Sequence, residues 1–302
     1  MHDAPAAAKF SLIGLAAHPE STLVTRVVTL LRQGPQGAGG LCDEVLGLPA
    51  APPAVAERLA VALLGADPRV RQLPDGRWAL VAEAQGSPLL EECAFAVVDV
   101  ETTGMRAALD DRITEIAVVV VHGSRREVVF ESLVNPGRPI PRAVCAITNI
   151  TDEMVRDAPP FTEIADSVLA ALAGRVFVAH NARFDWGFVA AELKRSRGLV
   201  LDGPRLCTVR LARRLMREVK GCGLDNLSQH FGLDNSARHR AAGDALVTAD
   251  LLARLLARAR EAGARTLEDL TAVQTQRAAA ARRRRQATPT EPRADSVPEG
   301  PA

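Results

Sequence analysis

Two carboxylates lie close together at the end of an apolar segment of this chain. Residues 95–98 are apolar, and Asp99 and Glu101 follow them with only Val100 in between. Side chains two residues apart on a β-strand point to the same face, so the two carboxylates are expected to lie side by side. Neighbouring anions are unfavourable unless a cation stands between them, and hard divalent cations prefer oxygen ligands. The pair therefore indicates a metal site, provided that other segments supply further ligands.

Two later segments supply such ligands. Asp185 stands near the start of a predicted helix, where free backbone N–H groups and the helix dipole favour an anion. His239 precedes the last long helix and Asp244 lies in its first turns, so both can face one cleft. Each residue taken alone has an ordinary explanation, as a helix-start aspartate or a solvated loop histidine. Together with Asp99 and Glu101 they form the set that two-metal phosphoryl transfer needs.

The chemistry of such a set is specific. Carboxylates hold two divalent cations about 3.5–4 Å apart, and the cations clamp the attacking and leaving oxygens of a phosphodiester. A histidine has an unperturbed pKa near neutrality and can take a proton from the attacking water. Without cations the carboxylates would repel one another. We therefore expect any activity of this site to depend strictly on divalent metal ions.

Composition limits the class of protein only loosely. The 302 residues carry a formal net charge of +1, which neither favours nor excludes a nucleic-acid partner. Nearly all positive charge is arginine, which suits phosphate, although a GC-rich genome also explains it. The five cysteines include no C-x-x-C pair, which fits a reducing compartment and disfavours a disulfide framework or a zinc site. No segment has the length of a membrane span, so we expect a cytoplasmic protein without a membrane partner.

The chain is predicted to have four parts. Residues 1–18 form an N-terminal segment, 19–84 a small domain, 93–262 a larger domain, and 263–302 a tail. The tail contains an arginine run followed by a proline- and charge-rich stretch, which predicts a frayed helix and then disorder. The arginine run can contact nucleic acid, although a solvated basic tail is commoner.

The small domain has the pattern of a winged helix. Apolar periodicity predicts helices over 21–31, about 41–46 and 53–64, followed by strands 70–73 and 77–81 around an Asp-Gly turn. Three helices and a hairpin resemble a winged helix, and the hairpin resembles the closing wing of HARE-type helix-turn-helix modules. Such domains bind either DNA or another protein, and no basic recognition helix is visible, so both kinds of partner stay open.

Strand and helix signals alternate over 93–262. Strands are predicted over 95–100, 112–121, 127–134 and 175–179, and helices near 152–157, 161–173, 184–195, 208–218, 224–231 and 241–259. A hairpin-sized gap separates the second and third strands. An antiparallel meander followed by strand–helix units predicts an α/β domain with a mixed sheet.

The three carboxylate-bearing segments resemble a known family. Val98–Gly104, His180–Asp185 and His239–Ala245, in this order, resemble the three exonuclease motifs of the DEDDh family. This is the DnaQ-like group, which includes the epsilon proofreading subunit of bacterial DNA polymerase III. Residues 112–117, 147–151 and 211–213 match as supporting stretches, and the resemblance covers about 95–256.

The resemblance implies a fold, an activity and a set of roles. The fold is RNase H-like, with a mixed five-stranded sheet flanked by helices, and the activity is 3′→5′ hydrolysis that releases nucleoside monophosphates with two Mg²⁺ or Mn²⁺ ions. Asp99, Glu101, Asp185 and Asp244 would be metal ligands, and His239 would be the general base. Thr102, Thr103 and Asn181 would contact the 3′-terminal nucleotide, whereas His180 and Phe184 are expected to be structural.

Two positions depart from the family pattern. Cys207-Thr208 stands where an Asp-Thr pair is frequent, and Ala146 replaces the glycine of a Gly-Ile-Thr segment. None of the five central positions is altered, which argues against an inactive nuclease.

The preferred function is therefore a DNA 3′→5′ exonuclease of proofreading or repair, with single-stranded DNA as substrate. An RNA exonuclease is the alternative, because the same five residues serve RNA trimming, and a non-catalytic nucleic-acid-binding scaffold is a further one. A basic segment (Arg205, Arg210, Arg213, Arg214, Arg217 and Lys220) can follow a phosphate backbone if it flanks the cleft, or else forms a solvated helix face. No clamp-binding peptide is apparent, so a polymerase or clamp partner is unsupported.

Overall fold

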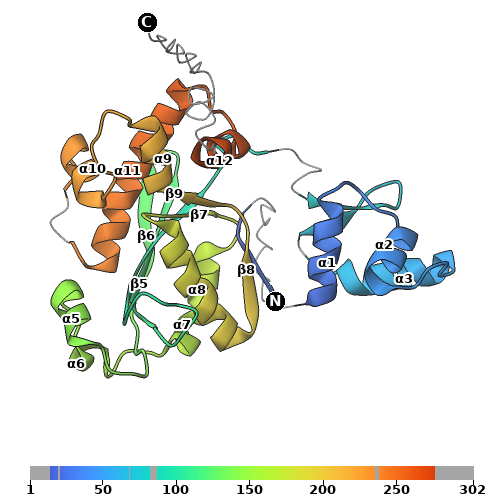
Figure 1. The fold of residues 1–302 in the computed structure, drawn as a ribbon, viewed down its shortest axis with the longest axis horizontal. Coiled ribbons are helices and arrows are strands. Elements are labelled where there is room, and N and C mark those ends of the chain that lie inside the picture. Colours follow the sequence, from blue (N-terminus) through green and yellow to red (C-terminus); the bar gives the residue numbers. More distant parts are fainter. Residues whose placement is uncertain (1–13, 20, 68, 82–86, 235–237, 276–302) are drawn as a thin grey trace, which may run out of the picture.

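A computed structural model describes residues 14–19, 21–67, 69–81, 87–234 and 238–275 of the chain. Its centre is a mixed sheet of five strands in the order β6-β5-β4-β7-β9 (Figure 1). The strands are β4 (Phe95–Thr102), β5 (Ile113–His122), β6 (Arg125–Leu133), β7 (Val176–Ala179) and β9 (Arg205–Cys207). β4 pairs antiparallel with β5 and parallel with β7. The mixed five-stranded sheet that the sequence predicts is confirmed.

Helices cover both faces of this sheet. One face packs on α9 (Thr208–Leu215), α10 (Leu224–Phe231), α11 (Ala241–Glu261) and α12 (Leu267–Thr275), and the other on α7 (Phe161–Leu172) and α8 (Ala182–Arg197). Successive residues of β4 enter opposite layers: Val97 lies in the α11 layer, and Ala96 and Val98 in the layer of α7 and α8. A central strand buried on both faces must be apolar throughout. This explains the unbroken apolar segment before Asp99.

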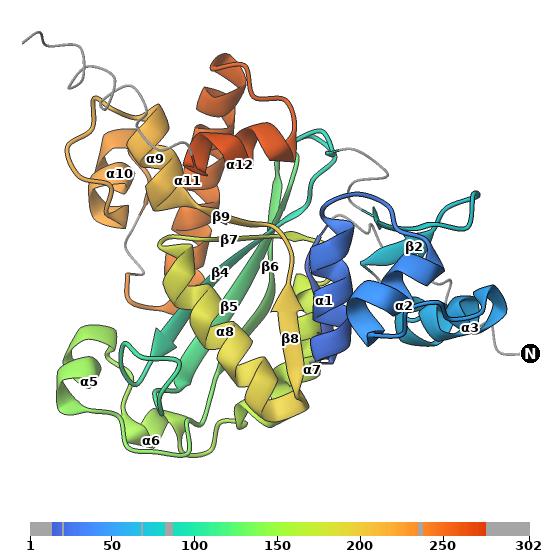
Figure 2. The same cartoon turned by 45° about the vertical axis from the view of Figure 1, so that its right-hand side comes forward.

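A separate small core holds the N-terminal helices. They are α1 (Thr22–Leu31), α2 (Ala38–Leu46) and α3 (Pro53–Leu64), and a hairpin of β2 (Val70–Gln72) and β3 (Trp78–Leu80) packs with them. The Ser21 side chain accepts the Val24 N–H and caps α1 as predicted. Both views place these helices beside β8 and apart from α9 and α10 (Figures 1 and 2). A helical N-terminal region is therefore confirmed, whereas its DNA or protein partner stays a prediction.

The N-terminal segment differs from the prediction. Residues 14–18 are part of the predicted segment 1–18, yet β1 (Ala16–Pro19) pairs antiparallel with β8 (Leu199–Asp202), which follows α8. The Leu15 N–H donates to the Arg175 carbonyl at 2.7 Å, which holds the chain against the end of α7. Residues 1–13 lie outside the described residues. A strand of four residues that contains alanine and proline carries almost no β signal, so the sequence could not reveal it.

The chain also continues to pack beyond the predicted boundary at 262. Leu267 and Leu270 of α12 are buried in the same core as α11. Gln274 accepts the Cys207 N–H at 3.0 Å and donates to the Arg205 carbonyl at 2.8 Å. The predicted disorder after residue 286 lies outside the described residues. Two short helices that connect β6 to α7, α5 (Arg142–Thr148) and α6 (Asp152–Val155), complete the fold, and no helix among the described residues is long and apolar enough to cross a membrane.

Gly14 gives a test of the contact between β1 and the rest of the fold. A Cβ at Gly14 would lie 1.9 Å from the backbone carbon of Gly174, where no side chain can fit. Gly14→Ala is therefore expected to lower the free energy of unfolding by about 1–3 kcal/mol. Gly39→Ala in α2 is the matched control, since nothing lies within 4 Å of its Cβ and alanine favours a helix. Thermal unfolding followed by circular dichroism measures both, and an equally stable Gly14→Ala variant would contradict the close contact between the Gly14 and Gly174 backbones.

Candidate active site

The end of β4 brings two carboxylates out of the core. Phe95 to Val98 are buried, after which Asp99 and Glu101 are half-buried and alternate with the buried Val100. Asp99 stands opposite Ala117 of β5, and Glu101 stands opposite Glu115. Both carboxylates therefore share one face of the sheet, as the spacing predicts.

Asp185 comes from the neighbouring strand–helix unit. β7 runs parallel to β4, so the two strands end at the same edge of the sheet. After β7 the chain turns at Asn181, which has a φ of 81° and is the N-cap residue of α8. Asp185 lies in the first turn of α8 and is 3% exposed. The helix start thus directs this carboxylate toward β4.

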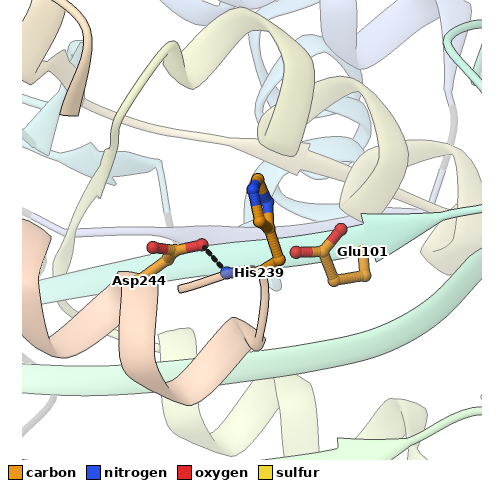
Figure 3. Close-up of side chains that lie close together, drawn as sticks. All are labelled: Glu101, His239 and Asp244. Atoms are coloured by element: carbon orange, nitrogen blue, oxygen red, sulfur yellow. Dashed lines mark hydrogen bonds between the residues drawn. The ribbon is translucent and has the colours of Figure 1, made fainter. Parts of the chain in front are cut away.

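His239 and Asp244 lie at the start of α11. His239 adopts a left-handed backbone with a φ of 61°, and its N–H donates to Asp244 Oδ2 at 3.0 Å. Glu101, His239 and Asp244 each place a possible ligand atom within 4.8 Å of the other two (Figure 3). Asp99 and Asp185 are outside this group of three, but their charges act on each other and on Glu101.

Burial and mutual repulsion raise the pKa of the four carboxyl groups. Burial is the main cause for Asp99, whose pKa lies well above its ordinary value, and the charges of Asp185, Asp244 and Glu101 add to it. Burial raises the pKa of Glu101 to about 7, again with a contribution from Asp244. Burial also raises the pKa of Asp185 to about 8, although backbone N–H groups partly oppose the shift. The pKa of Asp244 is raised by burial and lowered in part by the His239 N–H.

The donor set fits divalent cations. Asp244 Oδ1 is buried and has no hydrogen-bond partner among the described residues, which is costly for a carboxylate oxygen. A bound cation would satisfy this oxygen and offset the repulsion that raises the neighbouring pKa values. Carboxylate oxygens are the ligands that Mg²⁺ and Mn²⁺ prefer.

Glu115 and Arg240 hold the site together, and sequence reasoning did not assign them a role. Glu115 is 1% exposed, and its carboxylate accepts from Arg240 Nε and Nη2 at 3.0 and 2.6 Å and from the Ala241 N–H at 2.9 Å. Arg240 is the N-cap residue of α11 but makes no capping bond with its own side chain, so a strand residue caps the helix instead. His239 is thereby fixed between this ion pair and Asp244. The only signal in the sequence is a glutamate inside an apolar strand.

The predicted substrate-binding residues occupy the turns at the strand ends. The Thr102 hydroxyl donates to the Gly104 carbonyl at 2.6 Å, and the buried Thr103 hydroxyl accepts the Arg112 N–H at 3.0 Å. These hydroxyl groups shape the turn after β4. Asn181 is exposed. Contacts of the three residues with a 3′-terminal nucleotide stay a prediction.

His180 has a structural environment. Its Nδ1 lies 2.8 Å from Thr208 Oγ1, and burial lowers the pKa of His180 to about 4, so the ring is neutral near pH 7. This supports the structural role expected from the sequence. Phe184 packs beside Phe188 with ring centroids 4.9 Å apart, at the edge of the core.

Comparison with known proteins identifies the family. The exonuclease family model called RNase T matches residues 96–252. The chain belongs to this exonuclease family. The match covers β4 to α11 and includes all five residues that carry the predicted chemistry.

Several curated proteins are similar to the exonuclease region. The chain is 40% identical over 174 residues to a DNA polymerase III subunit epsilon-like protein of Rhodobacter capsulatus, covering 55% of this chain and 24% of that protein. It is 36% identical over 176 residues to the 3′-5′ exonuclease DinG of Bacillus subtilis, covering 58% of this chain and 19% of that protein. A DNA polymerase III PolC-type protein of Caldanaerobacter subterraneus is 34% identical over 186 residues, covering 62% of this chain and 13% of that protein. The chain thus spans a quarter or less of these relatives' lengths.

Solved structures are similar to more than half of the chain. Exonuclease X in complex with 5′ overhanging duplex DNA is 30% identical, with a TM-score of 0.48 over 60% of this chain and 99% of that one. Escherichia coli Exonuclease I in complex with a dT13 oligonucleotide is 19% identical, with a TM-score of 0.49 over 57% of this chain and 42% of that one.

The raised pKa values predict a pH-dependent stability of the metal-free protein. A carboxyl with a pKa of about 7 in the folded state and about 4.3 in the unfolded state favours folding while it is protonated. This contribution is present below pH 4 and is lost as the pH rises to 7 and above. In the presence of a chelator, Glu101→Gln is therefore expected to match the wild type at low pH and to unfold at a higher temperature than the wild type at pH 8.

Thermal unfolding at pH 5 and pH 8, with and without Mg²⁺, measures this effect. Mg²⁺ should stabilise the wild type more at pH 8 than at pH 5, because it replaces the protons. Equal losses of stability in Glu101→Gln and in the wild type between the two pH values would contradict the assigned pKa of Glu101.

The Glu115–Arg240 pair predicts a non-additive effect on the rate of any reaction at this site. Glu115→Gln keeps an acceptor for the Ala241 N–H but removes the negative charge of the ion pair. Arg240→Met removes the positive charge of the same pair. Each change is expected to lower the rate about 10–100-fold, as for residues that orient metal ligands. The double variant should be no slower than the worse single variant, because both remove one interaction. If the losses of rate in the two single variants multiply in the double variant, or if Glu115→Gln keeps the wild-type rate, the pair does not position His239.

Proposed function

We propose that the chain is a metal-dependent 3′→5′ exonuclease that removes nucleoside monophosphates from DNA 3′ ends in proofreading or repair. The observation that carries the proposal is the cluster of four carboxyl groups with raised pKa values, delivered by β4, α8 and α11 beside His239. Membership of the exonuclease family supports the same conclusion. A non-catalytic scaffold would not need to keep this costly arrangement.

Asp99, Glu101, Asp185 and Asp244 would hold two Mg²⁺ or Mn²⁺ ions. When bound, the ions supply positive charge for the phosphate and for the attacking and leaving oxygens. The α8 and α11 starts add favourable backbone dipoles for the Asp185 and Asp244 carboxylates.

His239 would act as the general base. The backbone N–H of His239 donates a hydrogen bond to Asp244, and its imidazole ring extends from the loop beside Glu101 (Figure 3). An imidazole nitrogen takes the proton of the attacking water as the new P–O bond forms, and the bond to the leaving 3′ oxygen breaks. The left-handed backbone of His239 costs conformational energy, which the bonds on either side of it offset.

DNA is the proposed substrate because of the similar proteins. Those of Rhodobacter capsulatus and Caldanaerobacter subterraneus carry the names of DNA polymerase III proteins. The scarcity of aromatic residues, 3% of the chain, favours contacts with phosphates over base stacking. We propose a single-stranded 3′ end as the substrate, with Thr102, Thr103 and Asn181 beside the terminal nucleotide. RNA is the competing substrate.

The experiment compares 5′-labelled DNA and RNA strands of one sequence. With Mg²⁺ the wild type is expected to produce a ladder of strands shortened from the 3′ end, faster on DNA, and Asp99→Ala should produce none. Faster cleavage of RNA would favour the competing substrate. No cleavage of either strand, or full activity of Asp99→Ala, would refute the enzymatic proposal.

His239→Ala tests the role of the base. Loss of a general base is expected to lower kcat about 10²–10⁴-fold, with little change in KM. His122→Ala, at the exposed end of β5, is the matched control and should keep the wild-type rate. A His239→Ala variant with an unchanged kcat would exclude His239 as the base.

A further inference from the structure

One exposed face of α9 and the turn after it carries five positively charged side chains. Leu211 and Ala212 are fully buried against the core, which fixes the orientation of the helix. Arg210, Arg213 and Arg214 of α9 are three and four residues apart, a spacing that aligns side chains along one side of a helix, and Arg217 and Lys220 follow in the turn after it. The basic strip consists of Arg210, Arg213, Arg214, Arg217 and Lys220, and all but the half-buried Arg214 are exposed.

These cations are not used in ion pairs. Within the described part of the chain, the ion pairs include none of the five residues of the basic strip. The one acidic side chain in the same stretch, Glu218, lies 3.9 Å from Arg258 of α11. Five like charges on one face repel one another, which an anionic partner would relieve.

The segment 208–225, which contains the basic strip, contacts at each end a residue next to a candidate site residue. At its start, Thr208 Oγ1 is 2.8 Å from Nδ1 of His180, the residue before Asn181. After its end, Asp225 of α10 forms an ion pair with Arg238, the residue before His239. Both views place α9 and α10 on the side of the fold away from the N-terminal helices (Figures 1 and 2). The basic strip thus lies on the segment between these two contacts.

We infer that the basic strip binds the phosphate backbone of the substrate strand on the 5′ side of the scissile nucleotide. This inference rests on the proposed function. Guanidinium groups pair with phosphate oxygens through two parallel hydrogen bonds. Within α9, Arg210 and Arg214 lie about 6 Å apart along the helix axis at 1.5 Å per residue, which is about two nucleotide spacings at 3.4 Å per nucleotide. The segment 208–225 contains no aromatic residue, so it contacts the backbone without reading the bases.

The test variant removes three exposed arginines of the basic strip, as Arg210→Gln, Arg213→Gln and Arg217→Gln together. The matched control removes three others, as Arg125→Gln, Arg254→Gln and Arg260→Gln. Arg125 lies at the end of the sheet opposite Asp99 and Glu101, and Arg254 and Arg260 are exposed on the distal part of α11. Both variants change the net charge equally, and melting curves check that both are folded.

Two measurements separate the strip from the catalytic proposal. The first is binding of a fluorescein-labelled dT20 strand in a chelator, by anisotropy at several salt concentrations, which needs no catalysis. The slope of the logarithm of the binding constant against the logarithm of the salt concentration should become less steep by about 0.7 for each lost phosphate contact. The test variant should therefore lose about 2 in slope, and the control should keep the wild-type slope. The second is the ratio of kcat/KM for dT20 to kcat/KM for dT3, which should fall about 10-fold or more in the test variant only.

Each outcome decides one question. A wild-type salt slope and a wild-type ratio in the test variant would overturn the inference, and so would equal losses in test and control, which would indicate net charge alone. A weakened slope in the test variant with no cleavage by the wild type would support the strip and refute the proposed function. Unchanged dT20 binding, together with loss of binding to an acidic polypeptide such as polyglutamate, would assign the strip to a protein partner and overturn the inference.

Discussion

Four buried or half-buried carboxyl groups near one edge of the sheet are the constraint on which the structure depends. Asp99, Glu101, Asp185 and Asp244 each have a raised pKa, mainly because burial disfavours ionisation, and charges of the other carboxylates add to the shift for Asp99, Glu101 and Asp185. The chain offsets this cost with fixed positive groups and backbone donors. Helix starts face Asp185 and Asp244, and the charge of Arg240 lowers the pKa of Glu101 in part. A bound divalent cation would compensate the remaining negative charge and satisfy Asp244 Oδ1, which has no hydrogen-bond partner among the described residues.

The sheet topology delivers these groups to one edge. β4 is buried on both faces and is therefore rigid up to the point where its carboxylates emerge. The parallel neighbour β7 ends at the same edge and passes the chain into α8. Glu115, opposite Glu101 on β5, reaches Arg240 and Ala241 and ties α11 to the sheet. A single buried glutamate thus links the carboxylates of β4 with the histidine loop, which makes the ion pair as important for the geometry as the carboxylates themselves.

The sequence predicted the parts of this site that local signals encode. The apolar run before Asp99, the helix starts at Asp185 and Asp244, and the strands β4 to β7 follow from periodicity and motif spacing. The pairing of Glu101 with Glu115 did not follow, because register between strands is set by long-range packing. β1 and α12 were also missed, since short segments with weak propensity become ordered only through contacts with β8 and β9. Local patterns therefore identify the reacting groups, and tertiary contacts determine how they are held.

Calorimetric titration of the metal-free protein with Mn²⁺ tests the central claim most directly. Performed near pH 7 in buffers of different ionisation enthalpy, it reports the number of ions bound and the protons released with them. The account predicts two ions per chain and a release of protons, because Glu101 and Asp185, with pKa values of about 7 and about 8, are partly protonated before the metal binds. Failure to bind Mn²⁺, or binding without proton release, would contradict it.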